Sequence, residues 1–158
     1  EHPENNNFAF AEEVTVRGNT TNRPDIVIYL NGIAVGVIEL KRSKVGISNG
    51  IRQNIGNQGI EYIQDFFSTA QILLAGNDSE GVRYGTIETK EKHYYRWVEE
   101  EIEDRLAKQV RETAEKTTSI LQKEITYLCY KERFLDIIRN FICFNKVFQC
   151  NKLILCQI

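Results

Sequence analysis

Residues 23–41 read "RPDIVIYLNGIAVGVIELK", two apolar runs on either side of Asn31-Gly32. An Asn-Gly pair between apolar runs is typical of a β-hairpin turn. Because both runs are apolar at successive positions, we expect both strands near the centre of a sheet that is covered on its two faces. Asp25, Glu39 and Lys41 interrupt this hairpin, and a charge removed from water needs an opposite charge or a metal ion.

The composition is typical of one globular domain, with 158 residues, 42% of them apolar and 27% charged. The apolar runs are shorter than the ~18 residues that a membrane span needs, so no membrane association is expected. Four cysteines without CxxC spacing indicate reduced thiols and a cytoplasmic protein. Methionine is absent, and we therefore expect a piece of a longer protein.

Basic residues gather around the hairpin, although the whole chain carries a formal charge of −2. Residues 22–53 hold five basic and two acidic side chains, a local excess of 5 − 2 = +3. A phosphate-bearing partner would be drawn to this region first, whereas the overall charge argues against a general nucleic-acid coat protein.

Hydrophobic patterns outside the hairpin predict further strands and one helix. We expect a strand within residues 7–16, a helix from the N-cap Ser48 to Phe67, and a pair of buried strands over 70–77 and 82–88.

From His93 onward the pattern becomes helical. We expect one apolar helical face that includes Trp97, Ile102, Leu106 and Val110, and a second helix over 131–144. The chain is thus predicted to have an α/β core over residues 1–90 and a helical extension over residues 91–158.

The charged residues of the hairpin suggest a metal site. Glu39 and Lys41 are two residues apart on a strand and therefore share one face, where Asp25 is expected to join them. Two adjacent carboxylates repel each other unless a divalent cation lies between them, and Mg²⁺ prefers oxygen ligands. The alternative is a buried ion pair that only stabilises the sheet.

The pairing register of the hairpin decides whether Asp25 and Glu39 can lie on the same face of the sheet. With a plain two-residue turn at Asn31-Gly32, Asp25 would pair with Ile38 and would lie on the opposite face from Glu39. A shared site therefore requires an odd-length loop, for example Leu30-Asn31-Gly32, or a β-bulge between residues 25 and 39, with Gly32 at positive φ.

These residues resemble the PD-(D/E)xK nucleases, and more closely the N-terminal nuclease region of the R subunit of type I restriction enzymes. The resemblance rests on residues 23–41 and on "QGIEY" at 58–62, with support from "LLAGNDSEGVRYGT" at 73–86 and "ERFLDIIRNFICF" at 132–144. It implies a restriction-endonuclease-like fold, a mixed β-sheet core flanked by helices.

The resemblance also implies Mg²⁺-dependent hydrolysis of phosphodiester bonds in double-stranded DNA. Asp25 and Glu39 would be metal ligands together with the carbonyl of Leu40, and Lys41 would be the catalytic lysine. Gln58 and Tyr62 would be the Gln-x-x-x-Tyr motif of the family. Gln58 and Tyr62 also continue the helical stripe of Ile51 and Ile55, so the alternatives are a satisfied buried amide and simple core packing.

In the R subunit an ATP-driven motor follows the nuclease, and the partners are the modification and specificity subunits. No GxxxxGK[ST] loop occurs in this chain, so ATP binding is expected only in the full-length protein. Many enzymes of this fold add an acidic residue from an upstream helix, which is not evident here. Two alternatives remain: a repair or resolvase nuclease of the same fold, and a non-catalytic docking module.

Overall fold

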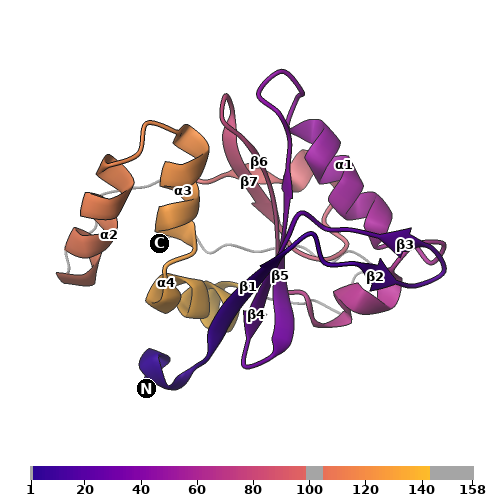
Figure 1. Cartoon of the computed structure of the whole chain (residues 1–158), viewed down its shortest axis with the longest axis horizontal. Coiled ribbons are helices and arrows are strands. Elements are labelled where there is room, and N and C mark those ends of the chain that lie inside the picture. The colour runs from indigo at the N-terminus through magenta and orange to yellow at the C-terminus, as the bar shows by residue number, and fades with distance from the viewer. Residues whose placement is uncertain (1, 99–104, 143–158) are drawn as a thin grey trace.

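The computed structural model describes residues 2–98 and 105–142. Its centre is a six-stranded mixed sheet, and Figure 1 shows helix α1 on one side of this sheet and helices α3 and α4 on the other. The predicted α/β fold, a mixed sheet core flanked by helices with a C-terminal helical part, is confirmed.

The strands of the large sheet follow the order β1-β4-β5-β6-β7-β8. Only β5 and β6 pair in parallel, and all the other neighbours are antiparallel. The strands are β1 (Phe8–Glu12), β4 (Ile26–Leu30), β5 (Ile33–Leu40), β6 (Ile72–Asn77), β7 (Gly81–Gly85) and β8 (Tyr95–Arg96). A separate two-stranded sheet consists of β2 (Val16–Arg17) and β3 (Thr21–Asn22).

The helices differ in length and type. The α-helices are α1 (Ser48–Asn57), α2 (Arg105–Glu115), α3 (Ile120–Leu128) and α4 (Lys131–Asp136). Short 3₁₀ turns occupy η1 (Pro3–Asn5), η2 (Gln64–Thr69) and η3 (Glu91–His93), and a π-helical turn η4 (Ile137–Phe141) continues α4.

The turn of the central hairpin has two residues, because Leu30 pairs with Ile33. Asn31 and Gly32 have φ angles of +52° and +83°, the left-handed conformation that a type I′ turn requires. The positive φ predicted for Gly32 is confirmed, whereas the three-residue loop given as an example does not occur.

A β-bulge then shifts the pairing register of the hairpin by one residue. Tyr29 pairs with Ala34, but Ile28 pairs with Gly36, so Val35 is the extra residue. The bulge predicted between residues 25 and 39 is therefore confirmed.

Both faces of the sheet are buried against apolar side chains. On one face Val37 and Leu73 pack with α1, η2 and Tyr94 in a core that includes Ile51, Ile63 and Phe67. On the other face Ile38, Leu74 and Val82 pack with α3 and α4 through Leu128 and Phe134. The C-terminal helices thus share a hydrophobic core with the strands.

Helix α1 is shorter than the predicted helix over residues 48–67, which is wrong beyond Asn57. Gly56 and Gly59 lie at its end, and each glycine costs about 1 kcal/mol in a helix relative to alanine. The chain then turns so that Ile63, only 1% exposed, enters the core.

The start of α1 also differs from the prediction, because Ile47 and not Ser48 is the N-cap residue, and its side chain forms no cap hydrogen bond. Instead, the Glu80 carboxylate accepts a hydrogen bond from the Ile47 backbone N–H at 2.9 Å. A residue distant in the sequence thus satisfies one free N–H at this end of the helix.

The continuous helical pattern predicted after His93 is wrong at its start, because Tyr95 and Arg96 pair with β7. Trp97 follows this strand and packs edge-on against Tyr84, with ring centroids 5.8 Å apart. Ile102 lies outside the described residues. The predicted helix over residues 131–144 corresponds to α4 and the π-helical turn as far as Phe141.

Within the described ranges, no helix combines the length and the apolar character that crossing a membrane requires. Cys129 is a free thiol, as predicted, and the other three cysteines lie outside these ranges.

Candidate active site

The bulge brings Asp25 and Glu39 to one face of the central hairpin. Ile26 pairs with Ile38, so continuing this register by one residue places Asp25 opposite Glu39. The Asp25 carboxylate accepts a hydrogen bond from the Leu40 backbone N–H at 2.6 Å, which holds it against the end of β5.

Glu39 is fully buried, with an exposed fraction of 0%. Within the described part of the chain, neither of its carboxylate oxygens has a hydrogen-bond partner. The ammonium of Lys41 is 3.8 Å from one of these oxygens, too far for a hydrogen bond. A buried polar group without a partner costs about 1–3 kcal/mol or more, so the position is unfavourable for a purely structural residue.

Burial in the sheet, reinforced by the negative charge and the proximity of the Asp25 side chain, raises the pKa of Glu39 to about 8, and Lys41 and the nearby Gln53 side chain lower it only in part. At neutral pH and without a cation, the Glu39 carboxyl is therefore mostly protonated. A divalent cation between the two carboxylates would displace this proton and would satisfy the oxygens that lack partners. The donor set thus fits a hard cation.

Lys41 is held by two hydrogen bonds beside the carboxylates. Its ammonium donates to the side-chain oxygen of Gln53 at 2.8 Å and to the carbonyl of Leu40 at 3.1 Å. Helix α1 brings Gln53 close because Gly50 faces the sheet: a Cβ at Gly50 would lie 3.2 Å from the Cβ of Ala75.

Gln53 was not predicted from the sequence, because it lies off the apolar stripe of Ile51 and Ile55. The buried side of this helix includes Gly50, Asn54 and Asn57, which are spaced by three or four residues. Small and polar residues at this spacing indicate that a polar face of the helix packs against the sheet, and this pattern could have drawn attention to the adjacent Gln53.

Gln58 has a different set of contacts. Its amide nitrogen donates to the Asn54 carbonyl at 2.8 Å, and its amide oxygen accepts from the Glu88 backbone N–H at 2.7 Å. These bonds connect the end of α1 to the loop after β7, and neither involves Asp25 or Glu39.

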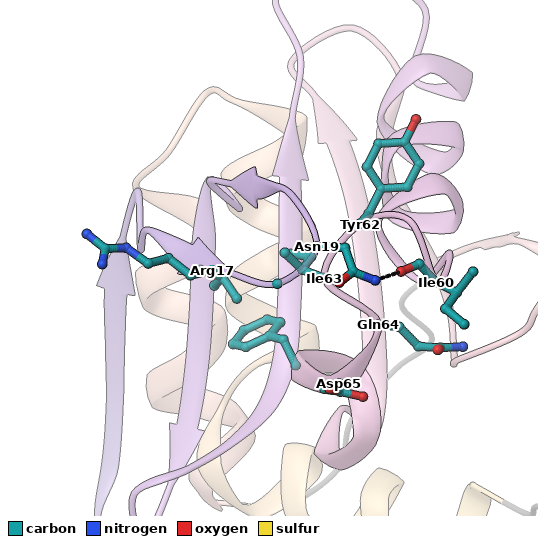
Figure 2. A pocket seen from close by; sticks show the side chains of 10 residues that line it. Arg17, Asn19, Ile60, Tyr62, Ile63, Gln64 and Asp65 are labelled. Atoms are coloured by element: carbon teal, nitrogen blue, oxygen red, sulfur yellow. Dashed lines mark hydrogen bonds between the residues drawn. The ribbon is translucent and has the colours of Figure 1, made fainter.

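Tyr62 lies beyond the end of α1, so the predicted helical stripe does not reach it. Its side chain is 40% exposed and lines a cavity of about 620 Å³, which Figure 2 shows between the β2–β3 hairpin and residues 60–66. Asn19 closes one side of the cavity through a hydrogen bond to the Ile60 carbonyl at 2.6 Å. Asp25, Glu39 and Lys41 do not line it.

The described residues contain no group of three or more His, Cys, Asp or Glu side chains placed to hold a metal ion. Of the acidic residues upstream, Glu13 pairs with Arg23, and Glu12 is exposed at the end of β1. The acidic donors at the site are therefore Asp25 and Glu39, and the carbonyl of Leu40, the third predicted ligand, accepts a hydrogen bond from Lys41.

A mixed sheet flanked by helices, with two carboxylates and a lysine at the adjoining ends of β4 and β5, is consistent with a nuclease-like α/β fold. The family model described as "Type I restriction enzyme R protein N terminus" matches residues 1–93 of this chain. The chain belongs to this family, which confirms the resemblance found in the sequence.

One relative is the type I restriction enzyme MjaVIIIP endonuclease subunit of Methanocaldococcus jannaschii. It is 31% identical over 144 residues, which cover 90% of this chain and 13% of the relative. The present chain thus corresponds to a small part of that protein.

The stability of the metal-free protein should depend on Glu39. In the unfolded chain this carboxyl ionises near pH 4.5, whereas in the folded protein it resists ionisation up to about pH 8. The free energy of unfolding should therefore fall between these values by about 1.4 kcal/mol per pH unit from this group, and Glu39→Gln should remove that decline.

Thermal or urea unfolding in a chelating buffer measures this effect, with Glu12→Gln as an exposed control. At pH 7, Glu39→Gln should be more stable than the wild type by roughly 3 kcal/mol. Parallel pH profiles of Glu39→Gln and the wild type would contradict the assignment.

Proposed function

We propose that this chain is the endonuclease domain of a type I restriction enzyme R subunit and that it hydrolyses phosphodiester bonds in double-stranded DNA with Mg²⁺. The observation that carries this proposal is the fully buried Glu39 carboxylate, which lacks hydrogen-bond partners and lies opposite Asp25 and near Lys41. Family membership supports it, and the relative described above is named as an endonuclease subunit.

Asp25, Glu39 and the Leu40 carbonyl would hold the ion, because oxygen ligands suit Mg²⁺. When bound, Mg²⁺ supplies Lewis acidity toward a phosphoryl oxygen and lowers the pKa of a bound water. The protein contributes a preorganised ligand set, since the Leu40 N–H fixes the Asp25 carboxylate and β5 fixes Glu39.

Lys41 supplies a positive charge at the same place. Its hydrogen bonds to Gln53 and Leu40 hold the ammonium where negative charge would develop on the phosphate in the transition state. Arg42 and Lys44 are exposed on the adjacent loop and would attract the DNA backbone. Arg52 and Arg23 are already paired with Glu91 and Glu13.

In the complete protein we propose an ATP-dependent motor beyond this domain and association with modification and specificity subunits. A GxxxxGK[ST] loop in the remainder of the parent protein would support the R subunit over a repair or resolvase nuclease. A purely structural docking module is disfavoured, because it would retain the energetic cost of burying Glu39 without any use for it.

Mg²⁺ should stabilise this chain through Asp25 and Glu39. At a Mg²⁺ concentration ten times the dissociation constant, the expected gain is about 1.4 kcal/mol, and it should increase up to about pH 8 because the Glu39 proton must leave. Thermal unfolding with and without Mg²⁺ measures it. Asp25→Ala and Glu39→Gln should lose the gain, whereas Glu12→Gln should keep it; equal shifts in all four proteins would refute a site here.

Asp25→Ala and Glu39→Ala should abolish DNA cleavage by the assembled enzyme and leave ATP-driven translocation intact, because only the ligand set is removed. Cleavage of plasmid DNA and a translocation assay on the same preparations measure the two activities. Loss of translocation in a folded variant, or cleavage at the wild-type rate, would contradict this assignment.

The roles of Gln53 and Gln58 can be separated by matched substitutions. The hydrogen bond from Lys41 leads us to expect that Gln53→Ala lowers the cleavage rate by about tenfold or more. Gln58→Ala should cost about 1–3 kcal/mol of stability through the lost bonds to Asn54 and Glu88. Cleavage rates and unfolding curves of both variants decide whether Gln58 also has the catalytic role predicted from the motif.

A further inference from the structure

The turn between β6 and β7 lies beside the loop that leads from Lys41 to α1. At its start Asn77 is fully buried, with an exposed fraction of 0%. Its amide nitrogen donates to the Val45 carbonyl at 2.9 Å and to the Glu80 carboxylate at 3.1 Å. Its amide oxygen accepts from the backbone N–H groups of Glu80 at 2.7 Å and Ser79 at 3.1 Å. Buried and fully bonded, Asn77 cannot reach a substrate.

Two more side chains of this turn reach the same loop. The Glu80 carboxylate accepts from the Ile47 N–H at 2.9 Å, and this bond lowers the pKa of Glu80 and keeps it ionised. The Ser79 hydroxyl donates to the Ser43 carbonyl at 2.9 Å. The turn therefore bonds to the loop at Ser43, Val45 and Ile47.

The position of this loop affects both sides of Lys41. The Lys41 backbone N–H donates to the Gly76 carbonyl at 2.9 Å, immediately before Asn77. The loop of residues 42–47 then carries the exposed Arg42 and Lys44 and ends at the start of α1, the helix that presents Gln53 to the Lys41 ammonium. A shift of residues 42–47 would thus move the basic side chains and Gln53 relative to the carboxylates.

The turn is itself held from its other side by α3. The Glu124 carboxylate accepts from the Val82 N–H at 2.5 Å, and the Ser119 hydroxyl lies 2.5 Å from the Asp78 carboxylate. Gly81 has a φ of +74°, a conformation that favours glycine, and a Cβ there would displace the Glu124 carboxylate. The turn is a fixed support for the loop and not merely a segment that follows it.

We infer that Asn77 and Glu80 are positioning residues for the nuclease reaction, which hold residues 42–47 so that Lys41, Gln53 and the basic side chains meet the same phosphate. This inference rests on the proposed function. Glu80 is the better residue to test, because it is exposed and its truncation removes the hydrogen bonds from the Ile47 N–H and the Asn77 amide without opening a cavity in the core.

The experiment compares Glu80→Ala with Glu80→Gln, which keeps an oxygen acceptor for the Ile47 N–H. Thr86→Val is the matched control, because it removes a buried hydrogen bond to the Gln71 carbonyl just beyond the other end of β7. In the assembled enzyme, Glu80→Ala should slow DNA cleavage by about tenfold with unchanged ATP hydrolysis. Glu80→Gln and Thr86→Val should stay within about threefold of the wild type.

Hydrogen exchange of the complete protein gives a readout that does not depend on cleavage. Peptides that cover residues 42–51 should exchange faster in Glu80→Ala and in Asn77→Asp. In Asn77→Asp the side-chain oxygen still accepts from the backbone of Ser79 and Glu80, but the amide that donates to the Val45 carbonyl is lost. The same peptides should exchange at the wild-type rate in Glu80→Gln and Thr86→Val.

Unchanged exchange of residues 42–51 in both Glu80→Ala and Asn77→Asp would overturn the inference. The inference would also be overturned if Glu80→Ala cleaved DNA as fast as Thr86→Val while Glu39→Ala did not cleave. A failure of the proposed function has a different result, because Glu39→Ala would then cleave like the wild type.

Discussion

Glu39 has two carboxylate oxygens in the interior of the sheet without a hydrogen bond to either, directly opposite Asp25. Desolvation and the neighbouring charge both oppose ionisation of this group, so its pKa rises to about 8. The surrounding fold must therefore hold two carboxyl groups close together on one face although Glu39 does not ionise readily. The single extra residue at Val35 makes this possible, since without it the two side chains would lie on opposite faces.

The two covered faces of the sheet explain how such a costly arrangement persists. Apolar contacts from α1 on one face and from α3 and α4 on the other bury the central strands, and this burial offsets the unfavourable electrostatics of one residue. The close approach of α1 depends on Gly50, which lets the helix lie against Lys41 and place Gln53 at its ammonium. Polar contacts at the site thus come from a helix face that is otherwise part of the core.

The proposed metal ligands Asp25 and Glu39 are separated from the cavity that Tyr62 lines. That cavity lies between the β2–β3 hairpin and residues 60–66, whereas the carboxylates lie at the adjoining ends of β4 and β5. The proposed site rests on the buried Glu39 carboxyl and on the two hydrogen bonds of Lys41, because burying a charged group is costly and requires a chemical reason.

The sequence by itself determined the central hairpin, its Asn-Gly turn, the three charged residues and the need for a bulge, because strand parity and turn chemistry act over a few residues. It also determined the strand pair after α1, and with it the α/β class. Only the tertiary structure decided that the extra residue is Val35, that Glu80 satisfies the start of α1, that Tyr95 and Arg96 form a strand and that Gln53 contacts Lys41. These features depend on contacts between segments distant in the chain, which override local helix and strand preference and leave no periodic pattern in the sequence.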